Sequence, residues 1–388
     1  MKKKLIRITT IPMALKYLLP GQMNFMQSNG FDVTMVSADS EERNDVIKNE
    51  NCPHLIVPLT RKITPLQDLK CLFQLIKIFR KEKPDIVHSH TPKAGLLGMM
   101  AARFCGIKIR IHTVAGLPLM VEKGNRFLLL KFIEKLTYAS ATQVWPNSAS
   151  IKDYIISHKL VPEKKVSVIL NGSTNGINLD RFSRNVLKEN ILDEIKKSIG
   201  YSTDNIYILF IGRLVFDKGI VELVTAFNEM QNGNERIKLI LAGDFENGLD
   251  PLPEAIINSI KTNESIIQVP WTQHVEYFMA ISNLFVFPSH REGFPNVLLQ
   301  AGAMKLPIIC SRIAGNVDIV TNEKTGLLFE VNNSSEIKDA FHFAIHNMDK
   351  MELMAESLEK KVQQNFKRED VWNAILQKYL SILNPEKN

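Results

Sequence analysis

The feature that most constrains this chain is a repeated alternation of short apolar runs, rich in β-branched residues, with longer amphipathic segments. Such alternation is typical of a parallel sheet whose strands are connected by helices. Helical spacing of apolar residues is clearest in Pro65–Lys81 and Gly124–Tyr138. The strands expected in the first half are Leu5–Ile8, Asp32–Ser37, Asp85–His88, Lys108–Thr113, Gln143–Trp145 and Lys165–Leu170.

The same pattern returns in the second half, which predicts a second α/β domain. Helices are expected at Gly219–Gln231, Val275–Ile281 and Asn296–Met304. Strands are expected at Ile206–Gly212, Ile237–Ala242, Ser265–Val269, Leu284–Pro288 and Pro307–Cys310. Two such domains imply a cleft where a ligand binds at the carboxyl ends of the strands.

The domain boundaries follow from the same pattern. We expect a first domain at residues 1–185 and a second at 200–365, with the polar segment 180–204 as linker because it has no strand pattern. Residues 366–388 contain an amphipathic segment, Arg368–Leu383, which we expect to be a helix that packs back toward the first domain.

Charge is distributed unevenly between the two halves. Residues 1–200 carry 31 Lys and Arg against 17 Asp and Glu, a net +14, whereas residues 201–388 carry 17 against 24, a net −7. The basic half indicates an anionic partner, which could be nucleic acid, an acidic membrane surface or a phosphorylated substrate. A solvated basic surface is the alternative that charge alone leaves open.

The remaining composition excludes several classes of protein. With 45% hydrophobic and 23% charged residues the 388-residue chain is neither disordered nor fibrous, and its four cysteines form no pattern typical of disulfide frameworks or zinc sites. No window approaches the roughly 18 uninterrupted apolar residues of a spanning helix. Arg7, Pro12 and Lys16 interrupt the apolar region that a secretory signal needs. We therefore expect a cytoplasmic protein with at most peripheral membrane contact.

The first local signal for chemistry is the turn after the expected strand at 206–212. Gly212-Arg213 ends the strand, and Lys218-Gly219 opens the next helix. A phosphate is favoured between a strand end and a helix amino end, where Arg213 can bind it with two hydrogen bonds and Lys218 adds a point charge. An ordinary surface loop is the alternative, because this pattern alone is weakly specific.

A second signal follows the expected strand at 284–288, in the sequence Pro288-Ser-His-Arg-Glu-Gly-Phe-Pro-Asn296. Gly293 lets backbone amides approach a ligand, and Pro295 suits the first turn of a helix. Glu292 is then a carboxylate beside the phosphate site that can accept hydrogen bonds from sugar hydroxyls. Its alternative role is to interact with the helix dipole.

Together these two segments resemble the donor-binding half of the retaining glycosyltransferases of family 4, which have the GT-B fold. Three segments of the first half, Asp85–Gly95, Ile111–Pro118 and Asn171–Asn178, are similar to the branch that builds bacterial surface polysaccharides. The resemblance covers nearly the whole chain. It implies two Rossmann-like domains facing each other across a cleft, the first binding the acceptor and the second the nucleotide-sugar donor.

The resemblance also implies a role for each matching residue. Arg213 and Lys218 would hold the diphosphate of a nucleotide sugar, expected to be UDP-linked, and would stabilise the charge that grows on it as the glycosidic bond breaks. Glu292 would contact the donor sugar. The complete donor-binding set is Gly212, Arg213, Lys218, Glu292, Gly293, Phe294, Pro295, Asn296 and Gln300. Because the sequence contains no D-x-D, we expect no metal and no other cofactor.

The sequence departs from the family pattern in two places. The second Glu of the family's E-x7-E is replaced by Gln300, which can still bind ribose hydroxyls but leaves donor preference open. In the first domain the family often has T-x-H-G, whereas Thr113-Val-Ala-Gly116 has Ala115 in place of the histidine. His112 is the candidate to substitute for it as a catalytic residue, with Gly116 on the acceptor side.

Other histidines and one tryptophan are candidates with structural alternatives. His88 and His90 fall at a strand end and either line the acceptor site or have structural roles. Trp271 either abuts the nucleotide base or packs in the core. His274 and His290 are expected to be surface or loop residues.

The sequence therefore predicts a retaining, metal-independent hexosyl- or N-acetylhexosaminyltransferase of capsule, O-antigen or exopolysaccharide biosynthesis. Its acceptor is expected to be polyprenyl-diphosphate-linked or another saccharide at the inner face of the cell membrane. Basic residues within 62–83 and 123–135 would hold the protein there electrostatically, without insertion. The alternatives are a GT-B-fold nucleotide-sugar epimerase and, outside enzymes, a nucleic-acid-binding protein. No G-x-G-x-x-G follows the first strand, which disfavours a nicotinamide-dependent oxidoreductase.

Overall fold

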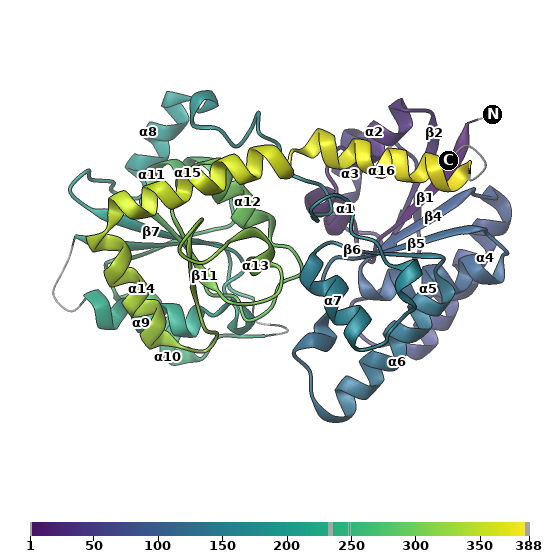
Figure 1. The fold of residues 1–388 in the computed structure, drawn as a ribbon, viewed down its shortest axis with the longest axis horizontal. Helices are drawn as coiled ribbons and strands as arrows, with labels where there is room; N and C mark the ends of the chain where they lie inside the picture. Colours follow the sequence, from purple (N-terminus) through teal and green to yellow (C-terminus); the bar gives the residue numbers. More distant parts are fainter. Residues whose placement is uncertain (1, 232–235, 247, 249, 385–388) are drawn as a thin grey trace. The chain divides into compact units, whose positions relative to one another are not determined.

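A computed structural model of the protein describes residues 2–231, 236–246, 248 and 250–384. The chain divides into two compact units (Figure 1). The first contains the chain up to residue 176 together with the segment that begins at Arg368, and the second contains residues 177–367. The boundary lies at 177 rather than near 185, because Ile177 and Phe182 are buried in the core of the second unit.

The first unit is built on a six-stranded parallel sheet with the strand order β3-β2-β1-β4-β5-β6. This order is that of the Rossmann fold, in which the direction of winding reverses between β1 and β4. The strands are β1 (Lys3–Ile8), β2 (Phe31–Ser37), β3 (His54–Ile56), β4 (Ile86–His90), β5 (Ile109–Val114) and β6 (Gln143–Pro146).

Helices cover both faces of this sheet. One hydrophobic core contains residues of α4 (Pro65–Glu82), α5 (Pro92–Phe104), α6 (Gly124–Ser140) and α7 (Ala149–Ser157). A second core contains residues of α1 (Pro12–Leu18), α2 (Gln22–Ser28), α3 (Arg43–Glu50) and the last helix, α16 (Arg368–Leu383). The amphipathic stripe of α16 therefore forms part of the first unit, with Val371, Ile375 and Tyr379 buried.

The second unit repeats the same topology. Its six-stranded parallel sheet has the order β12-β11-β10-β7-β8-β9, so the winding reverses between β7 and β10. The strands are β7 (Ile206–Ile211), β8 (Ile237–Ala242), β9 (Ile266–Val269), β10 (Leu284–Phe287), β11 (Ile308–Ser311) and β12 (Leu327–Phe329). The helices are α8 (Glu189–Ser198), α9 (Ile220–Gln231), α10 (Glu254–Thr262), α11 (Val275–Ile281), α12 (Asn296–Ala303), α13 (Asn316–Ile319), α14 (Ser334–His346) and α15 (Met348–Asn365).

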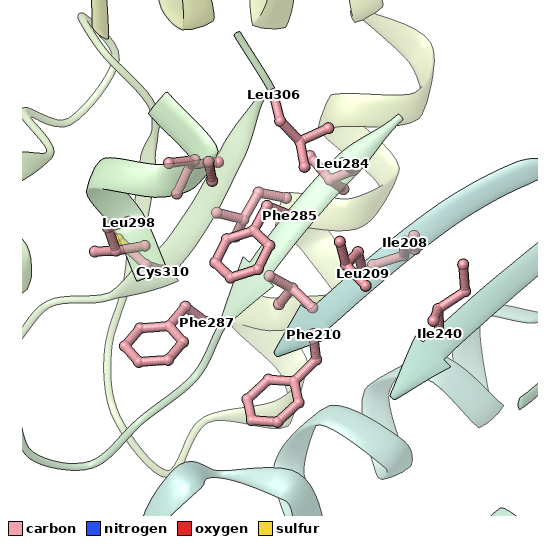
Figure 2. Close-up of a cluster of buried hydrophobic side chains, with 14 of the residues drawn as sticks. Ile208, Leu209, Phe210, Ile240, Leu284, Phe285, Phe287, Leu298, Leu306 and Cys310 are labelled. Carbon is pink, nitrogen blue, oxygen red and sulfur yellow. The ribbon is translucent and has the colours of Figure 1, made fainter. Parts of the chain in front are cut away.

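The central strands of the second unit are apolar on both faces, as a sheet covered on both sides requires. Figure 2 shows the large side chains of β7 and β10 in this core. Phe210, Phe285 and Phe287 are buried, and their rings stack with centroids 6.2–6.3 Å apart. These strands give a rigid base to the loops that follow them.

Three expectations about secondary structure were wrong or incomplete. Residues Lys165–Leu170 do not form a strand: only Val166 bridges to the sheet, at Val144, and Leu170 has a φ of 48° that turns the chain away. The segment 180–204 contains α8, which packs on α11 through a strongly amphipathic face and so belongs to the second unit. The three-residue strands β3 and β12 were missed because such short runs carry no periodic signal.

Candidate active site

The candidate site of the second unit lies where β7 and β10 end. These strands are neighbours in the sheet, and ligands of such folds bind outside the carboxyl ends of the strands at the point where the winding reverses. The turn Gly212–Gly219 follows β7, and the loop Pro288–Pro295 follows β10. The topology therefore brings together the two segments that the sequence singled out.

An ion pair joins the two segments at their functional residues. The ammonium group of Lys218 contacts Oε1 of Glu292, and Ser289 Oγ donates a 2.8 Å hydrogen bond to the same oxygen. The Lys218 and Glu292 side chains are only 19% and 16% exposed. Lys218 Nζ also lies 5.5 Å from the centroid of the Phe287 ring. A cation and a carboxylate are thus held side by side in a partly desolvated site.

The loop after β10 is fixed to the turn after β7 by further contacts. The backbone N–H of His290 donates to the carbonyl of Asp217 at 2.8 Å, and Arg291 Nε donates to Oδ2 of the same residue at 2.7 Å. His290 Nε2 lies 3.2 Å from Oε1 of Glu222 in the first turn of α9. These contacts hold the two segments against each other and so restrict the position of Glu292 relative to Lys218.

Gly219 shows how closely the two segments approach. It adopts a φ of +69°, and a Cβ atom there would lie 2.1 Å from the carbonyl oxygen of Pro288. Neither the conformation nor the space admits a side chain. The glycine after Lys218 is therefore required by backbone packing.

A third loop, after β11, supports the site from the side of Gly293. Gly315 has a φ of +84°, and a Cβ atom there would lie 2.6 Å from the Gly293 carbonyl oxygen. Ser311 Oγ donates to the Ser289 carbonyl at 2.5 Å, and buried Asn316 donates to the Ser311 carbonyl at 2.9 Å. Sequence reasoning missed these supporting residues. A Gly-Asn pair just after the predicted strand Pro307–Cys310 was the available signal.

Arg213 and Lys218 form ion pairs with different carboxylates in this structure. The Arg213 guanidinium forms an ion pair with Glu246, from the loop after β8, and its side chain is 55% exposed. An exposed arginine of this length can reorient when an anion binds, at the cost of its contact with Glu246.

The helix α12 begins beside Glu292. Pro295 precedes its first residue, Asn296, so the free amides and the positive end of the helix dipole lie next to the Gly293 loop. Phe294 is buried, with its ring centroid 5.5 Å from that of Phe366, so only its backbone is available to a ligand. Gln300 is half-buried and lies four residues after Asn296, on the same face of the helix.

Trp271 lies just after β9 and is 52% exposed. Its backbone N–H donates to Asp244 Oδ1 at 3.1 Å. The side chain is therefore not part of the core, which was one of its two expected roles. His290, expected in a loop, lies beside the Lys218–Glu292 pair.

In the first unit, His88 and His90 lie on one face of β4 in a buried polar network. Arg7 Nη2 donates to His90 Nε2 at 2.8 Å, and Arg7 Nη1 donates to the Tyr379 hydroxyl at 2.6 Å. His88 Nδ1 lies 2.5 Å from that hydroxyl, and its Nε2 lies 2.7 Å from Thr113 Oγ1. Burial, followed by the nearby Arg7 cation, holds the pKa of both imidazoles well below its ordinary value. Both histidines are therefore neutral at pH 7.

These histidines line a small pocket at the carboxyl ends of β4, β5 and β6. Its volume is about 20 Å³, which suits one water-sized molecule. Asn147, Ser173 and Thr174 also line it, so the segment at 171–178 converges on β4 and β5 as the family resemblance implied.

His112 lies on the opposite face of the sheet. Its Nδ1 is 2.9 Å from Ser89 Oγ, and a Cβ atom on Gly95 of α5 would lie 2.3 Å from its ring. The side chain is 3% exposed, and burial lowers its pKa to about 4. The structure therefore separates His112 from His88 and His90, and Gly116 lies half-buried in the turn after β5.

Comparison with known proteins gives the family of the chain. Residues 192–364 match the family model "Glycosyl transferases group 1", and residues 11–148 match "Glycosyl transferase 4-like". The capsular polysaccharide biosynthesis glycosyltransferase CapM of Staphylococcus aureus is 33% identical over 383 residues, which cover 98% of each chain. The chain belongs to the group 1 glycosyltransferases. This glycosyltransferase is also 27% identical to an Escherichia coli UDP-Gal:α-D-GlcNAc-diphosphoundecaprenol α-1,3-galactosyltransferase, over 80% of this chain and 79% of the relative.

Solved structures confirm the GT-B fold of the glycosyltransferase. The crystal structure of Anabaena Alr3699/HepE in complex with UDP superimposes with a TM-score of 0.80, at 16% identity, over 98% of this chain and 100% of the other. Among the described side chains of the glycosyltransferase, no group of three or more His, Cys, Asp or Glu is arranged to hold a metal ion. Within the same residues, no helix is both long and apolar enough to cross a membrane.

Proposed function

We propose that the protein transfers a hexosyl or N-acetylhexosaminyl residue, with retention of configuration, from a UDP-sugar to a polyprenyl-diphosphate-linked or other saccharide. Support comes from the relatives, one of which is named for a UDP-sugar donor and a diphosphoundecaprenol acceptor. In this proposal the second unit binds the donor, the first binds the acceptor, and the protein acts at the cytoplasmic face of the membrane in capsule, O-antigen or exopolysaccharide assembly.

The Lys218–Glu292 pair is the observation that carries the proposal. It stands at the point of the second sheet where a nucleotide is expected to bind, beside the amino end of α12. When a donor diphosphate enters, Lys218 exchanges the carboxylate for a phosphate oxygen. Glu292 is then free to accept hydrogen bonds from hydroxyls of the donor sugar. The pair is thus a preformed site for an anion joined to a polyol.

The chemistry required of the site is stabilisation of a leaving group. As the bond to the sugar breaks, negative charge grows on the diphosphate, and a cation already in place stabilises this state more than the ground state. Arg213 joins Lys218 in this role after leaving Glu246. Gly212, Gly293, Phe294 and Asn296 present backbone groups, Pro295 sets the start of α12, and Gln300 binds ribose hydroxyls. These cations replace the usual metal ion, so no metal is required.

Donor binding can be tested without knowledge of the acceptor. The purified protein is heated with UDP, with UDP-glucose, UDP-galactose and their N-acetyl counterparts, and with GDP- and ADP-sugars as controls. We expect protection from unfolding by UDP and by at least one UDP-sugar, and loss of protection in Lys218→Ala. If no nucleotide raised the unfolding temperature of the folded protein, the proposed donor site would be refuted.

A further inference from the structure

The loop after β10 meets α9 through a polar contact that has no role in the proposed reaction so far. His290 Nε2 lies 3.2 Å from Glu222 Oε1, and both side chains are only 13% exposed. The Phe216 ring lies edge-on to the His290 ring, with centroids 5.4 Å apart. Neither His290 Nε2 nor Glu222 Oε2 has another hydrogen-bond partner within the described part of the chain. The two side chains therefore depend on each other for a polar contact.

Glu222 brings a negative charge to this contact. Burial favours the neutral form of the carboxyl, but the contact with His290 and a hydrogen bond to its own backbone outweigh it, so the pKa of Glu222 lies below its ordinary value. The carboxylate is therefore ionised at pH 7 and attracts the N–H group of an imidazole. In a partly desolvated place this attraction is screened less by salt than an attraction between exposed charges.

The Glu222–His290 contact runs beside the ion pair of the donor site. Lys218 directly precedes the glycine before α9, and Glu222 lies four residues after Lys218, in the first turn of the helix. His290 lies two residues before Glu292, on the same loop. Both pairs therefore join the same two segments of the chain.

When a donor diphosphate separates the ion pair, other contacts must keep the loop in place. Arg291 binds Asp217, but these side chains are 44% and 34% exposed. Exposed ion pairs contribute little, because water and salt compete with them. The Glu222–His290 contact is better shielded from solvent, so it is the side-chain contact best suited to hold the loop while the donor is bound.

We propose that Glu222 and His290 are positioning residues that keep the Glu292 loop against α9 while the donor is bound. The inference rests on the proposed function for its purpose. Neither side chain is required to touch the donor: both act through Glu292, which must stay within reach of the sugar hydroxyls as the glycosidic bond breaks. Loss of the contact should therefore slow transfer without weakening UDP binding, because UDP carries no donor sugar for Glu292 to contact.

Hydrogen exchange of the ligand-free protein tests the contact itself. The backbone N–H of His290 donates to the Asp217 carbonyl and so reports on the loop. In Glu222→Ala, the amides of residues 288–295 should exchange at least about tenfold faster than in the wild type, whereas those of β7 and β10 should not change. Equal exchange of the loop in both proteins would overturn the proposal.

A double-mutant cycle tests the purpose of the contact. His290→Phe keeps a ring against Phe216 but removes Nε2. Glu222→Ala and His290→Phe should each lower kcat for transfer about tenfold, and the double variant should lose no more than either single variant, because all three remove the same contact. The Kd for UDP, measured by calorimetry, should stay within about threefold of the wild type. Multiplied losses of kcat, or a Kd that rises as kcat falls, would overturn the proposal.

A second ion pair on α9 provides the control for changes in this helix. The Glu229 carboxylate binds Lys338 of α14 at 2.9 Å, in a more exposed position. Glu229→Ala should leave kcat and the exchange of the loop unchanged. If the wild type bound no UDP, the donor site would be refuted, and the exchange experiment would still decide whether Glu222 holds the loop.

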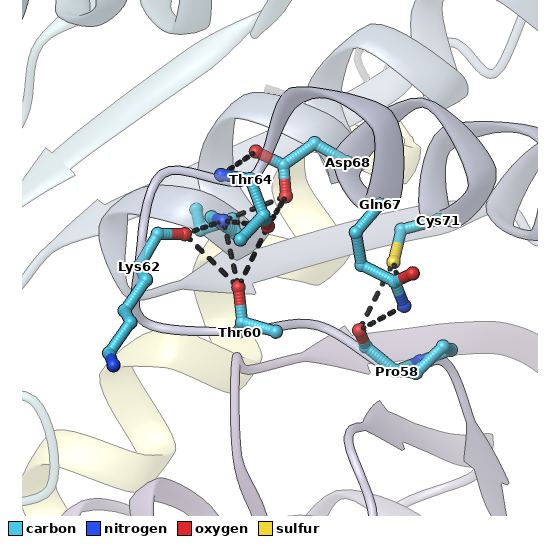
Figure 3. A network of polar contacts seen from close by, with 8 residues as sticks. Pro58, Thr60, Lys62, Thr64, Gln67, Asp68 and Cys71 are labelled. Atoms are coloured by element: carbon cyan, nitrogen blue, oxygen red, sulfur yellow. Dashed lines mark hydrogen bonds and ion pairs between the residues drawn. The ribbon is translucent and has the colours of Figure 1, made fainter.

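A buried ion pair of the first unit provides the control for general destabilisation. Figure 3 shows the polar network around Asp68, in which Lys93 donates to Asp68 Oδ1 at 2.7 Å. These side chains are 13% and 21% exposed, so their burial is similar to that of Glu222 and His290. Asp68→Ala should lower the unfolding temperature but leave the Kd for UDP and the exchange of residues 288–295 unchanged. Equally fast exchange of the loop in Asp68→Ala would overturn the proposal, because general destabilisation would then explain the effect.

Discussion

Arg7 and Tyr379, 372 residues apart in sequence, are joined by a 2.6 Å hydrogen bond from the guanidinium to the phenol oxygen. The bond connects β1, the first strand of the chain, to α16, its last helix. The same hydroxyl lies 2.5 Å from His88 Nδ1, and His88 Nε2 lies 2.7 Å from Thr113 Oγ1. The last helix thus supplies a hydrogen-bonding partner to a buried histidine in the candidate acceptor site.

Removing the Tyr379 hydroxyl should destabilise the first unit. Tyr379→Phe leaves a buried guanidinium N–H and a buried imidazole nitrogen without partners, at a cost of roughly 2–4 kcal/mol in the free energy of unfolding. Tyr154→Phe is the matched control, since the half-buried Tyr154 makes one 3.3 Å bond to the Leu119 carbonyl and should cost less than about 1 kcal/mol. Denaturant unfolding measures both, and equal costs would show that the network contributes little.

Lys218→Ala should lower turnover about 100-fold or more, because it removes a cation that faces the leaving diphosphate. Arg213→Ala should have a similar effect, whereas Glu246→Gln should lower KM for the donor, since Arg213 no longer has to leave an ion pair. Steady-state kinetics with the preferred UDP-sugar measure all three. Near-normal turnover in both cation variants would eliminate the diphosphate role, and an unchanged KM in Glu246→Gln would argue against reorientation of Arg213.

Gly219→Ala should abolish nucleotide binding, because its Cβ atom would displace the Pro288 carbonyl and with it the Glu292 loop. Gly200 provides the control: it has a similar φ of +62°, but a Cβ atom there would meet nothing within 4 Å beyond its chain neighbours. Gly200→Ala should therefore cost only the conformational strain of about 1–2 kcal/mol. Calorimetric titration with UDP distinguishes the two variants. Wild-type affinity in folded Gly219→Ala would show that the contact is not needed.

The buried carboxyl of Glu134 should make the first unit less stable as pH rises. Burial raises the pKa of Glu134 from 4.5 to about 7, so the folded state holds a proton that the unfolded state has already lost between these values. The cost grows from pH 4.5 to 7 and reaches roughly 3 kcal/mol. Glu134→Gln should therefore gain stability over the wild type across this window, whereas Glu163→Gln, on the surface, should not. A constant difference across pH would contradict the burial effect.

The two parallel α/β domains were predictable because each buried strand is recognisable from its own apolar sequence. Ile206–Ile211 and Ile237–Ala242 are largely apolar, which a strand buried on both faces requires. The proximity of Lys218 and Glu292 depends on the pairing of β7 with β10, because the two residues lie in the segments that follow these neighbouring strands. Lys165–Leu170 was mistaken for a strand because its composition is mostly apolar, whereas the φ of 48° at Leu170 leaves no local signal in the sequence.

The separation of the histidines could not be read from sequence. His88 and His90 are two residues apart on one strand and so share a face, but the side on which His112 lies depends on the register that pairs Ser89 with His112. The pairing of Arg7 with Tyr379 likewise leaves no local trace, because the two residues stand at opposite ends of the chain and meet only through the packing of α16. Arg213 was expected beside Lys218, and its partner Glu246 belongs to a loop that carries no motif.

Sugar transfer in the presence of excess chelator is the most direct test of the proposed reaction. The wild-type protein and Lys218→Ala are incubated with the UDP-sugar that protects the fold best and with a short-chain polyprenyl-diphosphate-linked N-acetylhexosamine. Released UDP and the anomeric configuration of the product are determined by NMR. We predict a product that keeps the donor's configuration, formed at the same rate with EDTA or Mg²⁺, and at most about one hundredth of that rate for Lys218→Ala. An inverted product, an absolute need for metal, or equal rates in both proteins would contradict the proposed site.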